Sequence, residues 1–300
     1  MSASARLAFA CFPVLVACTR QPPPAASTPP LVLASFPPLA DLAARIAGDD
    51  VPVECVLPPG QDPLHWRPSR AEVAAMQEAT LVVVNGASFE RWVDRISLPW
   101  SRVVDTTAAV RDRLLRFRTV THSHGPGGEH SHEGIDGHTW LDPHLAKAQA
   151  AAICDALARA FPHRAEAFRT RLADLHRDLD ALDARLRAVS EALADTRLLA
   201  SHPSYAYLAA RYGWEVGDLA LDPAAPLDDA ARARATAAAH GARRTVLLWE
   251  TAPLPETVAA LEACGIRSVV FAPGARRGAG EPDWLTLMQA NVARLAAAAE

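Results

Sequence analysis

Leu81-Val82-Val83-Val84 is the stretch that decides the fold of this chain. An unbroken apolar run rich in β-branched residues is typical of a strand that is buried on both faces. Helices bury both faces of a sheet when βα units follow one another and their strands run parallel. The run therefore predicts a parallel α/β fold.

The same alternation of apolar runs and helical patterns extends outward from this stretch. Before residue 110 it predicts strands at 31–36, 51–57, 81–85 and 103–105, and helices at 39–47, 69–78 and 89–96. Ser69 and Glu72 form a capping box, which defines the start of one helix. A second series nearer the C-terminus predicts strands at 198–201, 216–221, 245–249 and 268–271, and helices at 203–212, 228–240, 255–263 and 283–298.

The stretch between the two series is helical throughout. Asp142-Pro143 starts a helix to about Phe161, and Pro162 opens another to about Asp195. Leucines recur every three or four positions in the second helix: Leu172, Leu175, Leu179, Leu182 and Leu186. A coiled coil is the alternative, but the repeat is short. We expect two (βα) lobes with parallel sheets, at 31–160 and 196–300, joined by a connecting helix at 161–195.

The first thirty residues precede this body. Arg6 and the apolar run 7–17 predict an export signal that is too short to span a bilayer permanently. The run ends in Leu15-Val16-Ala17-Cys18, which resembles the lipobox of bacterial lipoproteins and implies lipidation of Cys18. An ordinary cleaved signal is the alternative. Residues 18–30 are a Pro-rich spacer, so we expect an exported protein, periplasmic or at the cell surface, with a lipid anchor.

Composition excludes several classes of protein. Half of the residues are hydrophobic, which excludes a mostly disordered chain. Thirty basic and thirty-four acidic side chains give a net charge of −4, so nothing suggests a nucleic-acid partner. Beyond the spacer only Cys55, Cys154 and Cys264 remain, which allows one disulfide or three unpaired thiols.

Histidines concentrate in one segment of the chain. Residues 121–137, the His-rich segment, contain five glycines and four histidines: His122, His124, His130 and His132. Because this segment has no apolar periodicity, we expect a mobile loop that carries these imidazoles. Imidazoles are good ligands for late divalent transition metals. We interpret these histidines as accessory metal collectors; a solvated polar loop is the alternative.

Directly after this segment stands His138-Thr139-Trp140-Leu141-Asp142-Pro143. It resembles the H-x-W-L-D-P element of the zinc and manganese solute-binding lipoproteins of ABC transporters, the cluster A-I family. Residues 201–207 with 211–213 are similar to the family's S-H-x-x-x-x-Y…Y-G element, and residues 60–68 to its G-x-D-P-H-x-[YW] element. Residues 246–250 match an apolar strand that ends in an acidic residue. Order and spacing agree across roughly residues 31–295.

The chain departs from the family pattern at the first histidine. The family's His follows D-P directly, whereas here Leu64 takes that position and His65 comes next. Two outcomes are open. The loop backbone adjusts to the one-residue shift and His65 binds the metal, or His65 points away and water or Asp62 takes its place as a ligand.

The predicted strand ends place the same residues together. His65, His202 and Glu250 each follow a predicted strand, and open parallel sheets bind ligands beyond the carboxyl ends of their strands. His138 precedes the helix that leaves the first lobe, so each lobe supplies two ligands to a crevice between them. Three imidazoles and one carboxylate suit tetrahedral Zn²⁺. We expect Asp142 to cap its helix and to orient a ligand histidine.

The resemblance implies a monomeric binding protein that captures Zn²⁺ and delivers it to an ABC permease and its ATPase. By the same resemblance, manganese-type members carry a carboxylate at the position of His202, so Mn²⁺ is the second choice of metal. A manganese carrier or adhesin of the same fold is an alternative. A zinc-dependent hydrolase is another, but the sequence has no H-E-x-x-H motif or nucleophile elbow, and we expect no enzyme.

Overall fold

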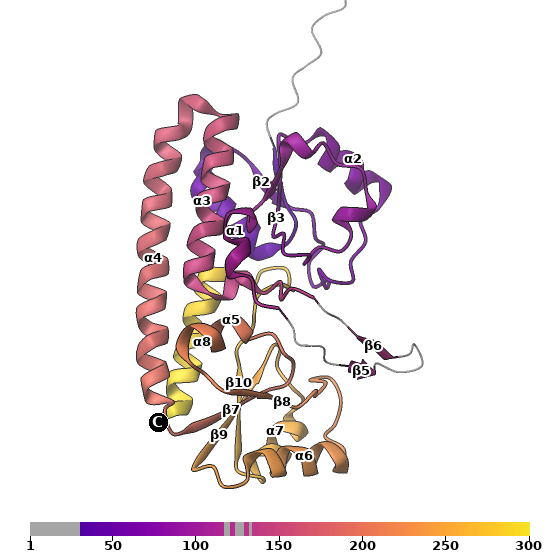
Figure 1. Cartoon of the computed structure of the whole chain (residues 1–300), viewed down its shortest axis with the longest axis vertical. Coiled ribbons are helices and arrows are strands. Elements are labelled where there is room, and N and C mark those ends of the chain that lie inside the picture. The colour runs from indigo at the N-terminus through magenta and orange to yellow at the C-terminus, as the bar shows by residue number, and fades with distance from the viewer. Residues whose placement is uncertain (1–30, 117–120, 124–128, 132–133) are drawn as a thin grey trace, which may run out of the picture.

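The computed structural model describes residues 31–116, 121–123, 129–131 and 134–300 (Figure 1). Its first parallel sheet has the order β2-β1-β3-β4, formed by β1 (Val32–Ala34), β2 (Val53–Cys55), β3 (Leu81–Val84) and β4 (Val103–Asp105). Its second parallel sheet has the order β10-β9-β7-β8, formed by β7 (Thr196–Ala200), β8 (Val216–Asp218), β9 (Arg244–Trp249) and β10 (Ile266–Val270). The prediction of two parallel-sheet α/β lobes is confirmed.

The apolar run at β3 is buried on both faces, as its composition predicts. Val83 lies in the cluster that contains Phe36 and helix α1 (Pro37–Ala47). Val82 and Val84 point to the other face, where they share a cluster with Met76 of α2 (Arg70–Glu78). Because residues alternate between faces, this single strand contributes to two separate clusters.

Most predicted helices are present near their expected bounds. The capping box of Ser69 and Glu72 starts α2, and Asp142 caps α3 (Pro143–Ala160) by accepting from the His144 backbone N–H. The second lobe contains α5 (Ala206–Tyr212), α6 (Asp229–Ala239), α7 (Pro255–Glu262) and α8 (Trp284–Ala299). None of the described helices combines the length and apolar character that crossing a membrane requires.

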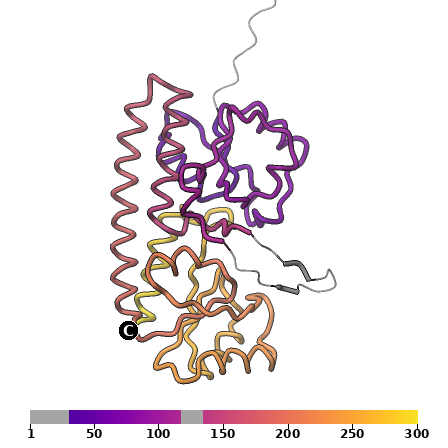
Figure 2. Tube along the Cα trace, viewed as in Figure 1, coloured from indigo at the N-terminus to yellow at the C-terminus, as the bar shows by residue number. Residues whose placement is uncertain are grey.

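The longest helix, α4 (Ala165–Ala192), runs beside both lobes (Figure 2). A short 3-10 turn at Pro162–Arg164 separates it from α3, with which it forms an antiparallel pair. Along its length α4 packs against α1 and α3 of the first lobe and against α8 of the second. Its buried stripe contains Leu175, Leu179, Leu182 and Leu186 from the predicted leucine repeat. One helix thus gives the two lobes a common support.

Two local predictions differ from the structure. Residues 89–96 form no α-helix but a single 3-10 turn at Val93–Arg95. Ala87 and Ser88 have left-handed φ of +51° and +58°, and Phe89 and Trp92 are buried from an irregular backbone. In the His-rich segment, the expected loop contains a short antiparallel pair, β5 (Thr121–Ser123) with β6 (Glu129–Ser131).

The described cysteines are all free thiols. Cys154 is buried, while Cys55 and Cys264 are partly exposed. Of the two possibilities left open by the sequence, the structure has the unpaired thiols.

Candidate metal site

His138 is held by a buried carboxylate two residues before it. Its Nδ1 lies 2.8 Å from Asp136 Oδ1, and its backbone N–H donates to the same oxygen at 2.9 Å. The His138 side chain is 15% exposed and that of Asp136 is 1% exposed. A carboxylate only accepts, so Nδ1 is the donor in this bond; in the neutral imidazole, Nε2 then carries the lone pair that a metal needs. The carboxylate that holds His138 is thus that of Asp136, whereas Asp142 caps α3, as predicted, and pairs with Arg211.

Aromatic side chains limit the orientation of the His138 ring. Its centroid lies 5.3 Å from that of Trp140 and 5.9 Å from that of Phe89. Trp140 is fully buried, and its indole N–H donates to the carbonyl of Pro273 in the other lobe at 2.9 Å. The ring is therefore fixed both by its hydrogen bond and by packing at the joint between the lobes.

A buried polar network supports the backbone beneath His138. Asn85, directly after β3, donates to the Gly137 carbonyl at 2.9 Å and accepts from Thr139 Oγ at 3.0 Å. Its backbone N–H donates to Glu90 at 2.6 Å. Burial raises the pKa of Glu90 to about 7, although hydrogen bonds from Ser35, Asn85 and Gly86 act in the opposite direction. The end of β3 is thus connected to the segment that carries His138.

His202 and Glu250 follow neighbouring strands. The register of β7 with β9 continues past Ala200, because the Ser201 N–H donates to the Leu248 carbonyl at 2.9 Å. His202 is exposed, and the carboxylate of Glu250 accepts from the hydroxyl of buried Ser204. The sequence therefore correctly placed both residues at one edge of the second sheet.

His65 has no comparable support. It lies in the loop between β2 and α2, and its side chain is 81% exposed. Its Nδ1 is 3.3 Å from Asp62 Oδ2, and this oxygen also forms an ion pair with Arg276 of the other lobe. Arg277, the next residue, pairs with Asp41 of α1. The loop between β10 and α8 thus reaches across to the first lobe.

The four predicted ligands do not surround a common point. Within residues 31–116, 121–123, 129–131 and 134–300, no three His, Cys, Asp or Glu side chains are grouped closely enough to hold a metal ion. The structure brings Asp136 to His138, Asp62 to His65 and Ser204 to Glu250. In the His-rich segment, His122 is paired with His130 in the β5–β6 register. His124, His132 and Cys18 lie outside the described residues.

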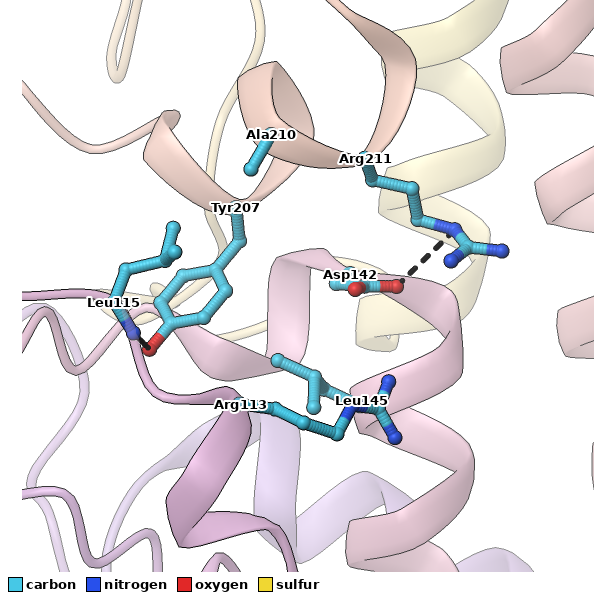
Figure 3. A pocket seen from close by; sticks show the side chains of 7 residues that line it. All are labelled: Arg113, Leu115, Asp142, Leu145, Tyr207, Ala210 and Arg211. Atoms are coloured by element: carbon cyan, nitrogen blue, oxygen red, sulfur yellow. Dashed lines mark hydrogen bonds and ion pairs between the residues drawn. The ribbon is translucent and has the colours of Figure 1, made fainter.

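Helix α5 meets the first lobe at a pocket of about 140 Å³ (Figure 3). The pocket is lined by Arg113, Leu115, Asp142, Leu145, Tyr207, Ala210 and Arg211. Arg211 Nε lies 2.8 Å from Asp183 of α4 and 3.3 Å from Asp142. Burial raises the pKa of Asp183, but hydrogen bonds from Arg211, Tyr212 and Arg187 outweigh it and lower the pKa to about 2. This ion-pair network fastens α5 to the long helix.

Sequence reasoning missed Asp136, Asn85 and Tyr207 as supports of the site. Asp136 offered a local signal, because an Asp side chain readily accepts from the backbone N–H two residues later. Asn85 and Tyr207 offered none, since their partners are 52 and 71 residues away in the sequence.

A family model described as zinc-uptake complex component A, periplasmic (ZnuA), matches residues 32–298. The chain belongs to the ZnuA family. The resemblance inferred from the four motifs is confirmed.

One relative in sequence and two solved structures are similar to this chain. The zinc-binding lipoprotein AdcA of Streptococcus pneumoniae is 31% identical over 215 residues, which are 69% of this chain and 42% of AdcA. This chain thus spans less than half of that relative. The metal-dependent lipoprotein YcdH of Bacillus subtilis superposes with a TM-score of 0.77 at 20% identity, covering 90% of this chain and 98% of YcdH. The Zn(II)-bound ZnuA-like domain of the same AdcA has a TM-score of 0.74 at 23% identity, with 91% and 99% covered. These similarities show the fold.

Proposed function

We propose that this chain is an extracytoplasmic binding protein that captures Zn²⁺ and delivers it to an ABC permease. The observation that carries the proposal is His138, whose Nδ1 is held by buried Asp136 so that Nε2 is available as a ligand. Histidines that bind metals commonly donate their other ring N–H to a carboxylate in this way. Family membership over residues 32–298 supports the same function.

The proposed ligands are His138, His202, His65 and Glu250. Three imidazoles with one carboxylate favour Zn²⁺, whereas Mn²⁺ prefers more oxygen ligands. Since the four side chains are not gathered around one point, zinc binding has to move the exposed His65 and free Glu250 from Ser204. Protons compete for the imidazoles, so zinc affinity falls as the pH falls, which assists release.

The partners and location follow from the same proposal. The chain passes zinc to a permease driven by an ATPase, acts as a monomer, and is held at the membrane by a lipid on Cys18. The ZnuA family is described as periplasmic, and AdcA is a lipoprotein, which supports this location. The family is a component of an uptake system, which favours transport over zinc-dependent hydrolysis.

Equilibrium competition with a chromophoric zinc chelator tests the proposal. The purified chain is compared with His138→Ala, His202→Ala and Glu250→Ala, and His240→Ala is the control because it is an exposed histidine after α6. We expect tight zinc binding that the first three substitutions weaken and the control does not. Equal binding by the wild type, His138→Ala and His202→Ala would overturn the assignment. A parallel titration with Mn²⁺ distinguishes the two metals.

A further inference from the structure

Tyr207 of α5 places its hydroxyl between two segments of the other lobe. The hydroxyl donates to the carbonyl of Asp136 at 2.8 Å and accepts from the N–H of Leu115 at 3.1 Å; Figure 3 shows the second bond. The side chain is buried, and its ring packs with Leu145 and Val110. One phenol therefore satisfies a backbone acceptor and a backbone donor at the same time.

These two partners lie at either end of an excursion, residues 116–135, which contains the four histidines of the His-rich segment. Leu115 directly precedes this excursion and Asp136 directly follows it, and the two are also joined directly, because the Asp136 N–H donates to the Leu115 carbonyl at 2.8 Å. Arg116 and Ile135 form an antiparallel bridge beside them. Tyr207 thus binds the closed base of this excursion to α5.

Asp136 connects this base to the metal site. Its backbone is held by Leu115 and Tyr207, and its Oδ1 holds both the ring and the backbone N–H of His138. Its other oxygen, Oδ2, is buried without a hydrogen-bond partner among the described residues. The carboxylate is therefore placed by its backbone rather than by a second side-chain contact, so a shift of the backbone moves the oxygen that His138 depends on.

The other side of Tyr207 leads to His202. Helix α5 begins at Ala206, four residues after His202, and the intervening Ser204 is bonded to Glu250. The short stretch from His202 to Tyr207 thus connects the candidate ligands of the second lobe with Asp136 of the first lobe, which holds His138.

We propose that Tyr207 is a positioning residue that sets the metal-binding nitrogen of His138 through Asp136. The inference rests on the proposed zinc-binding function. Without the hydroxyl, the buried Asp136 carbonyl and Leu115 N–H lose a partner and the Asp136 backbone relaxes. A neutral imidazole that is no longer held at Nδ1 divides between its two N–H forms, and only one of them presents Nε2 to a metal.

Tyr207→Phe removes the hydroxyl and keeps the ring. Tyr212→Phe is the matched control, because Tyr212 also lies on α5 and its hydroxyl donates to Asp183 of α4 at 2.9 Å. By chelator competition we expect Tyr207→Phe to weaken zinc binding about tenfold, within the range of substitutions at residues that orient ligands. Tyr212→Phe should stay within about twofold of the wild type, because it does not contact the base of the His-rich segment.

A second readout needs no zinc. Ring ¹⁵N shifts of His138 are measured in the metal-free chain at a pH where the imidazole is neutral. We expect a proton on Nδ1 in the wild type and in Tyr212→Phe, and a mixture of N–H forms in Tyr207→Phe. Asp136→Asn, which keeps an acceptor oxygen but loses the charge, should shift the same equilibrium and serves if Tyr207→Phe does not fold.

The two readouts separate the failure of this inference from failure of the proposed function. A wild type that binds no zinc, but whose His138 form still depends on Tyr207, refutes the function and leaves the positioning role intact. Unchanged His138 nitrogen shifts in Tyr207→Phe, or in Asp136→Asn if Tyr207→Phe does not fold, overturn the inference, whatever the zinc affinity. Equal zinc binding by Tyr207→Phe and Tyr212→Phe overturns it as well.

Discussion

His138 and His65 are both candidate ligands of the first lobe, but the fold supports them very differently. His138 is mostly buried, bonded to Asp136 and packed against two aromatic rings, those of Phe89 and Trp140. His65 is 81% exposed, and its nearest charged partner, Asp62, is shared with Arg276. The His138 imidazole is thus held in one orientation by the fold, whereas the exposed His65 imidazole is not.

On the proposed function, this difference sets how much free energy each histidine contributes to metal binding. A ligand that the fold has already oriented loses little conformational freedom on binding, whereas an exposed side chain loses several rotamers. The same contrast fits a carrier, which has to release its cargo. On the proposed function, the firmly held His138 contributes most of the affinity, and the exposed His65 is the ligand that we expect to leave first.

Removing His138 should have the largest effect. We expect His138→Ala to weaken zinc binding at least about 100-fold, because it deletes a ligand that is already oriented. Chelator competition at constant pH measures this, with exposed His163→Ala as the control. A loss of less than about threefold would show that the supported histidine is not a ligand, and the comparison with His65 would fail.

The support beneath His138 should depend on pH through Glu90. Its pKa is raised from 4.5 to about 7 in the folded chain, so the folded state binds this proton more tightly than the unfolded state. The stability that this proton contributes is complete below about pH 4.5 and is lost as the pH rises through 7, by about 3 kcal/mol in all.

Denaturant unfolding between pH 4.5 and 8 checks this expectation. Glu90→Gln should flatten the dependence, whereas Glu78→Gln, on the exposed face of α2, should leave it unchanged. Parallel curves for the wild type and Glu90→Gln would show that Glu90 does not titrate in this range.

Removing His65 should cost less than removing His138. We expect His65→Ala to weaken zinc binding about tenfold, because the conformational entropy lost when this exposed loop residue is ordered offsets part of the free energy of its bond to zinc. Dissociation followed by stopped flow should show faster zinc loss than in the wild type. If His65→Ala and His138→Ala bind zinc equally, then the firmer hold of the fold on His138 does not increase its contribution to zinc affinity.

The smallest effect should come from Arg276. Its ion pair with Asp62 is half exposed, so Arg276→Gln should change the free energy of unfolding by less than about 0.5 kcal/mol. It also removes a cation beside His65, and we expect zinc affinity to rise about twofold, less so in high salt. Arg277→Gln is the contrast: it leaves the half-buried Asp41 carboxylate without its guanidinium and should destabilise the chain without that rise. A fall in affinity for Arg276→Gln would mean that the arginine helps to place His65.

Local sequence signals were sufficient for much of the fold. The run at 81–84 predicted a strand buried on both faces, and the capping box at Ser69 and the cap at Asp142 marked helix starts to the residue. They were insufficient at 89–96, where an apolar pattern suggested a helix. There the side chain of Glu90 folds back onto the N–H groups of Asn85 and Gly86, and the left-handed residues before it set a different path.

The sequence by itself determined most of the elements, the parallel direction of the main strands and the residue types available to a metal. These properties depend on hydrophobic period, caps and motifs that act within a few residues of one another. Only the tertiary structure decided which histidine is held ready, because Asp136, Asn85 and Tyr207 act through hydrogen bonds that depend on how segments far apart in the chain pack. The identity of the candidate ligands is thus given by local sequence, whereas the orientation of their side chains depends on how the two lobes pack.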